Sequence, residues 1–243
     1  MKKKAVCLIS GGIDSCVTAY LAKNESYSIY ALTVDYGQQH RKEIECAKKI
    51  SKSIDVKDHI ILNIDFRKFG GSSLTDKSIE PETNRSLHEI GKNIPSTYVP
   101  ARNTVFLSIA LAYAEAIDAE SIFIGLTSTD YSGYPDCRPE YVKSFRKMAK
   151  LATKKGIEGN PIKIKTPLLY KSKSEIIKKG LELKVQFENT WSCYKGGNKA
   201  CGRCDSCVLR LKGFKEAKAK DPIKYDYFPD WYKTQDSSFF LSL

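Results

Sequence analysis

Short runs of β-branched and other apolar residues alternate with longer amphipathic stretches through the first two thirds of the chain. Four runs are typical of strands buried on both faces: 5–10, 29–35, 57–63 and 121–125. Apolar residues recur at three- and four-residue steps between and after them, which predicts helices over 13–23, 38–51, 102–116 and 138–154. This alternation predicts an α/β fold, a parallel twisted sheet with helices on both faces. The loops 10–15, 35–40 and 125–140 should then meet at the carboxyl ends of the strands, where such folds bind ligands.

The pattern changes after residue 160. We expect residues 1–160 to form the α/β domain and residues 161–243 to form a C-terminal region packed on it, with a helix from Lys173 and a later Lys-rich helix. Residues 70–98 are rich in Gly, Ser, Thr, Asn and Pro, which predicts a long loop of the kind that often acts as a lid. The apolar runs are too short to cross a bilayer.

The N-terminus begins with lysines and an apolar run, but two glycines and an aspartate then interrupt it. This favours a first strand over an export signal, and we expect a cytoplasmic protein. In a reducing compartment the 8 cysteines of the chain point to metal binding or catalysis rather than to disulfides.

The chain is basic, with 40 Lys and Arg against 28 Asp and Glu. The excess lies in residues 141–243, which hold 23 Lys and Arg against 10 Asp and Glu. This C-terminal part is a candidate anion-binding surface, although a Lys-rich surface that only aids solubility has the same composition.

The segment Ser10-Gly-Gly-Ile-Asp-Ser15 follows the first predicted strand and opens the first predicted helix. Free backbone N–H groups and the helix dipole at such a position bind anions, and glycines let the backbone approach a phosphate. The segment lacks the Lys-Ser/Thr end of a Walker loop. We interpret it as a phosphate site rather than an ordinary tight turn.

Four cysteines near the C-terminus form the second motif: Cys193, Cys201, Cys204 and Cys207. Four thiolates suit one tetrahedral Zn²⁺ with no open position for water, so the predicted site is structural. An iron–sulfur cluster and free buried thiols are the alternatives.

The third motif runs from Asp130 to Glu140 and is dense in hydrogen-bonding groups directly after the last predicted strand of the domain. Loops in that position hold substrates in α/β proteins, although a Pro/Gly turn with incidental polar residues is the alternative. Arg102, just before the third helix, is a candidate for binding phosphate or carboxylate, or for bracing that helix.

Several strings together resemble the 7-cyano-7-deazaguanine synthase family of the N-type ATP pyrophosphatases, also called the PP-loop superfamily. They run in order from residue 4 to about residue 222. The strings are SGGIDS, DYGQQH with Glu43, YVPARNTVFLS, SGYPDCRPE, TPL, SKSEII, TWSCY and CGRCDSCVLR.

The resemblance implies a Rossmann-like fold and an ATP-dependent ligase that converts 7-carboxy-7-deazaguanine and ammonia to 7-cyano-7-deazaguanine through adenylated intermediates. It also implies Mg²⁺ with ATP, for which Asp14 is the suspected ligand, and one structural Zn²⁺ per chain. A cytoplasmic homodimer that needs no membrane and no nucleic acid is expected.

Carried over residue by residue, the resemblance places each kind of site as follows. Nucleotide binding falls on Ile9, Ser10, Gly11, Gly12, Ile13, Asp14, Ser15, Cys16, Val17, Thr18 and Ala19; catalysis on Ser10, Asp14, Ser15, Arg102 and Arg138; zinc on the four cysteines. For the deazapurine, chemistry and position suggest Asp130, Asp136 and Arg138.

Two other functions stay open at this stage. One is an adenylating enzyme of the same superfamily that acts on tRNA, which the basic C-terminal half and the cysteines would suit. The other is a zinc-ribbon nucleic-acid-binding module with a vestigial nucleotide fold, which would leave SGGIDS and SGYPDCRPE unexplained.

Overall fold

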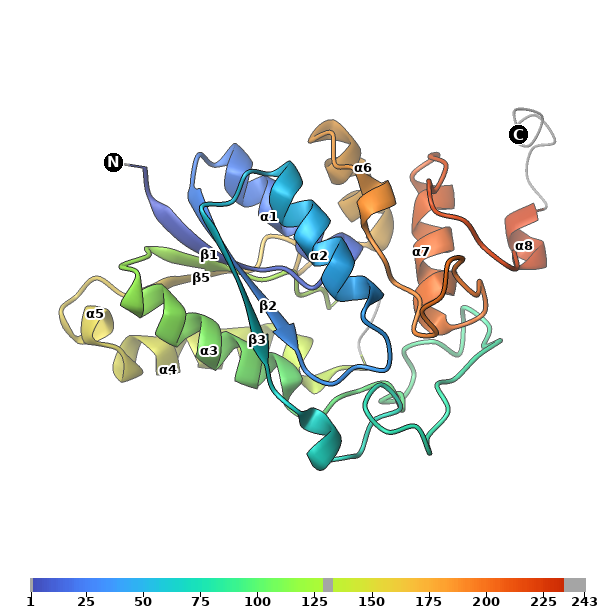
Figure 1. Ribbon diagram of the computed structural model, residues 1–243, viewed down its shortest axis with the longest axis horizontal. Coiled ribbons are helices and arrows are strands. Elements are labelled where there is room, and N and C mark those ends of the chain that lie inside the picture. Colours follow the sequence, from blue (N-terminus) through green and yellow to red (C-terminus); the bar gives the residue numbers. More distant parts are fainter. Residues whose placement is uncertain (1, 129–132, 234–243) are drawn as a thin grey trace.

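A five-stranded sheet lies at the centre of the computed structural model, which describes residues 2–128 and 133–233 (Figure 1). The strands are β1 (Lys4–Leu8), β2 (Ser28–Asp35), β3 (Asp58–Asn63), β4 (Ser121–Phe123) and β5 (Lys163–Lys165). Their order across the sheet is β3-β2-β1-β4-β5, and every neighbouring pair is parallel. The predicted fold class is confirmed.

Helices cover both faces of the sheet (Figure 1). On one face lie α1 (Ile13–Asn24), α2 (Lys42–Ser53) and α6 (Lys173–Glu182); on the other lie α3 (Arg102–Ala116) and α4 (Pro139–Ala152), which the short α5 (Lys154–Ile157) follows. Each layer has its own apolar core, because side chains alternate across every strand. Ala5 and Cys7 of β1 are buried in the first core, and Val6 and Leu8 are buried in the second.

The start of α6 has a clear local cause. Ser172 accepts a hydrogen bond from the backbone N–H of Glu175, and the Glu175 carboxylate accepts one from the backbone N–H of Ser172. This capping box satisfies two backbone groups that a helix end leaves open. It places Lys173 at the first turn of the helix.

The remaining helices, α7 (Asp205–Glu216) and the short α8 (Asp230–Lys233), lie at one end of the molecule (Figure 1). The chain runs outward from β1 to β3 and then returns to β4 on the other side of β1. The strand order therefore reverses between β1 and β4, and the crevice at this reversal is where open α/β sheets bind ligands.

Two strands differ from the sequence prediction. β5 was not predicted, and it completes the sheet from within the segment 161–243 that was expected to form the C-terminal region. β3 is not buried on both faces, because it is an edge strand, and its Ile60 and Leu62 are exposed. Apolar composition alone does not distinguish an edge strand from a central one. The helix α8 was not predicted at all.

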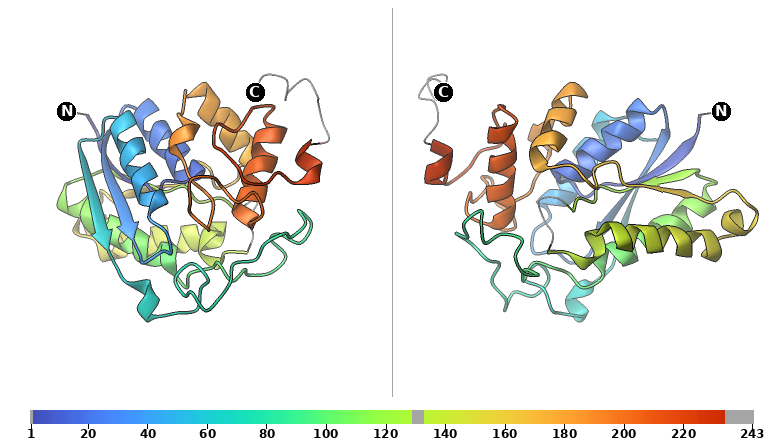
Figure 2. Two further views of the ribbon diagram at one scale, coloured as in Figure 1. Left: turned by 45° about the vertical axis from the view of Figure 1, so that its right-hand side comes forward. Right: turned by 180° about the vertical axis from the view of Figure 1, so that it is seen from behind.

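The 70–98 segment has no helix or strand of its own and runs beside α7 (Figure 2). An isolated antiparallel β-bridge between Thr83 and Cys204 connects it to the cysteine-rich segment, and the Asn84 N–H donates a hydrogen bond to the Arg203 carbonyl. Arg85 adds an ion pair with the buried Asp205. The predicted loop is therefore held at this point; whether it acts as a lid stays a prediction.

Across residues 2–128 and 133–233, none of the helices combines the length and the apolar character that crossing a bilayer requires.

Candidate functional site

A cavity of about 290 Å³ opens at the reversal point, between the carboxyl ends of β1, β2 and β4. Residues of the 10–15 and 124–127 loops line it. Charged and aromatic residues reach it from distant segments, among them Arg102 from α3, Lys173 from α6 and Trp191 from the segment before the cysteines. The fold thus brings together groups that are far apart in the sequence, such as Ser10 and Trp191.

The 10–15 loop is braced by its own hydroxyls. Ser15 Oγ lies 3.1 Å from both the backbone nitrogen and the Oγ of Ser10, and it donates to the Gly12 carbonyl at 3.0 Å. Helix α1 begins at Ile13, and no described side chain caps its N-terminus. Its first N–H groups therefore stay available for an anion in the cavity, as the sequence suggests.

Two glycines allow neighbouring backbone segments to pack closely against the 10–15 loop. Gly11 has φ +92°, and a Cβ there would lie 2.1 Å from the backbone oxygen of Glu43. A Cβ on Gly125 would lie 2.7 Å from the carbonyl carbon of Asp14, so the loop after β4 presses directly on the loop after β1. Both positions therefore exclude a Cβ, and no role for Gly125 was predicted from the sequence.

Lys173 supplies the cation that the 10–15 loop itself lacks. Its Nζ lies 2.6 and 2.8 Å from the two carboxylate oxygens of Asp14, and both side chains line the cavity. Lys173 was not among the site residues predicted from the sequence. The capping signal at Ser172 marks the helix start, but only the folded chain shows that this helix faces the loop.

Arg102 lies in the cavity wall, as predicted. Its Nη1 donates to the Tyr36 hydroxyl at 3.2 Å, and its guanidinium lies over the Tyr36 ring. Burial opposes the charge of Arg102, but the neighbouring Tyr36, Tyr134, Asp136 and Glu43 raise its pKa further above its ordinary value. The guanidinium is a fixed positive charge inside the cavity.

Glu43 also lines the cavity, from the first turn of α2. Burial raises the pKa of this carboxyl to about 7, although the charge of Arg102 acts in the opposite direction. Glu43 follows the DYGQQH string and was part of the resemblance, but no role was predicted for it from the sequence.

The predicted deazapurine residues are arranged differently. Asp136 is buried and accepts a hydrogen bond from the backbone N–H of Asn103 at 2.9 Å, so it caps the start of α3. Arg138 is exposed and donates to the Pro135 carbonyl. Neither side chain is among those that line the cavity. Asp130 lies outside the described residues.

The predicted nucleotide segment divides into two parts. Its first part faces the cavity through Ile9, Ser10, Gly12, Ile13, Asp14 and Ser15. Gly11 shapes the loop, and its carbonyl accepts from the Trp191 N–H at 2.9 Å. The second part, Cys16, Val17, Thr18 and Ala19, is buried along the inner side of α1 and does not line the cavity. These four residues therefore position the loop by packing.

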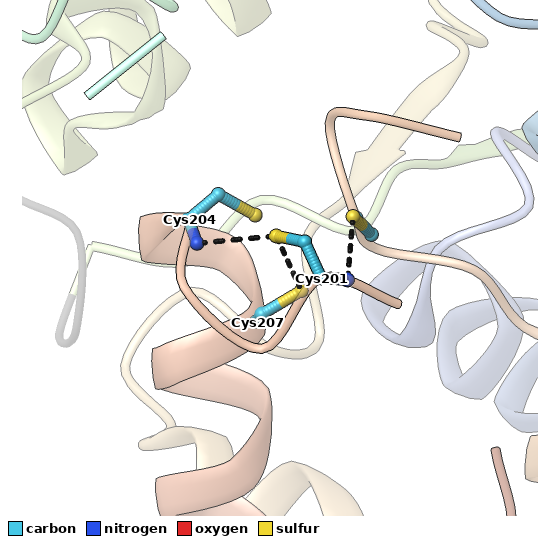
Figure 3. A group of neighbouring side chains, drawn as sticks. Cys201, Cys204 and Cys207 are labelled. Carbon is cyan, nitrogen blue, oxygen red and sulfur yellow. Dashed lines mark hydrogen bonds between the residues drawn. The ribbon is translucent and has the colours of Figure 1, made fainter. Parts of the chain in front are cut away.

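The four predicted metal ligands come together. The Sγ atoms of Cys193, Cys201, Cys204 and Cys207 all lie within 4.8 Å of one another, and those of Cys201 and Cys207 are 3.9 Å apart. Figure 3 shows the three cysteines of the 201–207 segment with their sulfur atoms turned toward one another. A tetrahedral zinc site with Zn–S bonds of about 2.3 Å places its sulfurs about 3.8 Å apart, so this set could hold Zn²⁺.

Hydrogen bonds to sulfur support this assignment (Figure 3). The N–H groups of Lys195 and Cys201 donate to Cys193 Sγ, and those of Arg203 and Cys204 donate to Cys201 Sγ. The pKa of Cys201 lies far below its usual range because the three neighbouring thiols, and the Arg203 N–H, stabilise its thiolate, whereas the pKa values of Cys204 and Cys207 are raised mainly by their bonds to the same neighbours. The other ligands would lose their protons on binding the metal.

The cysteine cluster adjoins the cavity through Trp191. The indole Nε1–H donates to the Cys193 carbonyl at 2.9 Å, while the backbone N–H of the same residue bonds Gly11. Ser192 and Tyr194 also line the cavity. The segment that would hold the metal is therefore part of the cavity wall.

Comparison with known proteins gives a consistent result. A family model described as "Queuosine biosynthesis protein QueC" matches residues 4–218. A 7-cyano-7-deazaguanine synthase of Coxiella burnetii is 53% identical over 92% of this chain and 98% of its own. That of Saccharophagus degradans is 52% identical over 92% and 98%. That of Picrophilus torridus is 52% identical over 95% of each chain.

Proposed function

Because the chain belongs to the QueC family and is an enzyme of queuosine biosynthesis, we propose that it is an ATP-dependent ligase that makes 7-cyano-7-deazaguanine from 7-carboxy-7-deazaguanine and ammonia. The single observation that carries the proposal is the convergence on one cavity of the uncapped α1 N-terminus, Lys173 and Arg102. This arrangement suits a nucleoside triphosphate bound beside the carboxylate of a second substrate.

The chemistry requires activation, because a carboxylate has no good leaving group. A carboxylate oxygen attacks the α-phosphorus of ATP, pyrophosphate leaves, and an acyl adenylate forms. Ammonia then adds to the carbonyl carbon, and AMP leaves with that oxygen to give the amide. The amide oxygen attacks a second ATP in the same way, and loss of AMP and the two N–H protons leaves the nitrile.

In this scheme the N–H groups at the start of α1, with Ser10 and Ser15, hold the pyrophosphate that leaves. Lys173, which lies beside Asp14 in the cavity, neutralises the negative charge that develops on the leaving pyrophosphate. Arg102 binds the carboxylate and then the adenylate. Fixed donors of this kind accelerate the reaction because they need no reorganisation as charge develops.

Two metals belong to the proposal. The four clustered cysteines would hold one structural Zn²⁺, which would fix the position of the Trp191 side chain in the cavity wall, since its indole donates to the Cys193 carbonyl. Mg²⁺ would accompany ATP, with the Asp14 carboxylate as its protein ligand and charge neutralisation on the phosphates as its chemistry. From the resemblance we also propose a cytoplasmic homodimer that needs no nucleic acid.

The test is a mass-resolved product assay with ATP, Mg²⁺, ammonium and 7-carboxy-7-deazaguanine, beside the same mixture with bulk tRNA in place of the deazapurine. We expect the nitrile together with AMP and pyrophosphate in the first mixture. Turnover only with tRNA would refute the proposal and favour an RNA-modifying enzyme. ADP in place of AMP would refute the adenylation step.

The role of Lys173 has its own test. Lys173→Met should lower kcat/KM for ATP about 100-fold or more, because a charged hydrogen bond to the phosphates is lost at the transition state. Lys178→Met changes an exposed residue of the same helix and should leave that constant unchanged. Equal activity of the two variants would show that Lys173 only pairs with Asp14.

A further inference from the structure

The carboxylate of Glu43 has no assigned partner in the cavity. Among residues 2–128 and 133–233, no hydrogen bond or ion pair reaches its side chain, and Arg102 interacts with it only electrostatically. Among the described residues that line the cavity, the other acidic side chain is that of Asp14, and it is already paired with Lys173. In its ionised form, Glu43 therefore presents an acceptor-only group to a ligand that enters the cavity.

The surroundings of Glu43 suit a flat ring. Its backbone oxygen packs against Gly11, and Gly11 in turn bonds the backbone of Trp191. Trp191, Tyr36, Phe106 and Tyr194 all line the same cavity. Aromatic walls with a few fixed polar groups are typical of sites for planar heterocycles.

We propose that Glu43 is the residue that selects a guanine-like base in this cavity, by accepting two parallel hydrogen bonds from the ring N–H and the adjacent exocyclic amino group. This inference rests on the proposed function, because the substrate there is a deazaguanine. A carboxylate has two oxygens spaced to accept such a pair. It takes the role that the sequence suggested for Asp136, whose carboxylate instead caps α3.

The same geometry separates the organic substrate from ATP. The corresponding edge of adenine offers one amino donor beside a ring nitrogen that only accepts. An acceptor-only carboxylate would face that nitrogen with no proton between them, which costs free energy. Glu43 thus both selects the deazaguanine and keeps the adenine of ATP out of this part of the cavity.

Burial independently raises the pKa of Glu43 to about 7. A carboxylate that is poorly solvated without a ligand gains more from two N–H donors than an exposed one does.

The experiment compares the binding of two ligands by calorimetry: 7-carboxy-7-deazaguanine and the matched analogue without the exocyclic amino group. The wild-type protein should prefer the amino ligand about 10- to 100-fold, the range expected for a hydrogen bond to a charged acceptor. Glu43→Gln should bind the deazaguanine about 10- to 100-fold more weakly and lose the preference. Its KM for ATP should stay unchanged.

Glu45→Gln is the matched control, because Glu45 lies on the same first helical turn but is exposed. It should bind both ligands as the wild type does. Zinc content and urea unfolding of Glu43→Gln establish that this variant folds.

Each contrary result has a distinct meaning. Wild-type protein that binds both ligands equally overturns the role of Glu43 without any variant. Glu43→Gln with wild-type affinity and preference also overturns it, as does a raised KM for ammonium with unchanged deazaguanine affinity. If the wild type binds ATP but neither deazapurine, the proposed function itself falls.

Discussion

A buried ion pair joins the cavity wall to the C-terminal region. Arg210 of α7 donates through Nε and Nη2 to the two oxygens of Asp221, at 2.7 and 2.9 Å, and both side chains are at most 2% exposed. The Tyr225 hydroxyl and the Ile223 N–H donate to the same carboxylate. Arg210 also donates to Thr190 Oγ1 at 2.9 Å. Asp221→Ala removes the centre of this network.

The expected cost follows from what the substitution leaves behind. The Arg210 guanidinium keeps its bond to Thr190 but loses its counter-charge in a buried position. Breaking a buried pair in this way costs about 3 to 5 kcal/mol, because the remaining charge is neither solvated nor paired. The Tyr225 hydroxyl also loses its acceptor, which adds about 1 kcal/mol. We expect the free energy of unfolding to fall by about 4 kcal/mol or more.

The assay is equilibrium unfolding in urea at constant free zinc, with zinc release followed beside the spectroscopic signal. Arg210 lies one turn beyond Cys207 on α7, so Asp221→Ala should release zinc at lower urea concentration. Asp226→Ala, at an exposed position nearby, is the control and should change stability by less than about 0.5 kcal/mol. A loss below about 1 kcal/mol for Asp221→Ala would refute the reasoning.

Three further predictions concern the site. Gly11→Ala should raise KM for ATP about 10-fold or more, because its Cβ would meet the Glu43 backbone. Gly159→Ala is the control, because Gly159 has a similar positive φ but open space around it, and it should leave KM unchanged. Equal effects of the two substitutions would contradict the steric argument. Cys204→Ser should lose zinc by elemental analysis, whereas Cys46→Ser, buried nearby, should keep one zinc per chain; zinc retained in Cys204→Ser would argue against the four-cysteine site. Burial raises the pKa of Glu43 from 4.5 to about 7, so its protonated form stabilises the fold at low pH and this stability is lost as pH rises through 7. Glu43→Gln should therefore gain about 1 to 3 kcal/mol over the wild type between pH 5 and pH 8 in urea unfolding, and a pH-independent difference would disprove the shift.

The sequence predicted the sheet and its helices because their signals are local. The 102–116 helix was predicted with the bounds that α3 has, since apolar periodicity and its flanking residues lie within one short window. The burial of β3 was not predictable, because edge position depends on the strand order. The cysteine cluster was predictable for the same local reason, since three of its four members lie within one turn-and-helix segment; that it holds zinc stays a prediction.

The cavity depends on contacts that sequence spacing does not encode. Lys173 meets Asp14 only because α6 packs against α1, and Glu43 reaches the site only because Gly11 lets α2 approach. Asp136 was predicted to bind the substrate, but its carboxylate accepts a hydrogen bond from the Asn103 N–H at the start of α3. The polar composition of the 130–140 loop therefore indicated correctly that the loop lies at the cavity, but it did not indicate which of its side chains face the cavity.

The central claim is that the carboxylate is activated by adenylation, and heavy-oxygen labelling tests it most directly. The purified protein is given ATP, Mg²⁺, ammonium and 7-carboxy-7-deazaguanine with both carboxylate oxygens labelled, and the nucleotide products are analysed by mass spectrometry. The account predicts label in AMP, one oxygen in each molecule, and none in pyrophosphate. Unlabelled AMP, or label in inorganic phosphate with ADP as the nucleotide product, would contradict it.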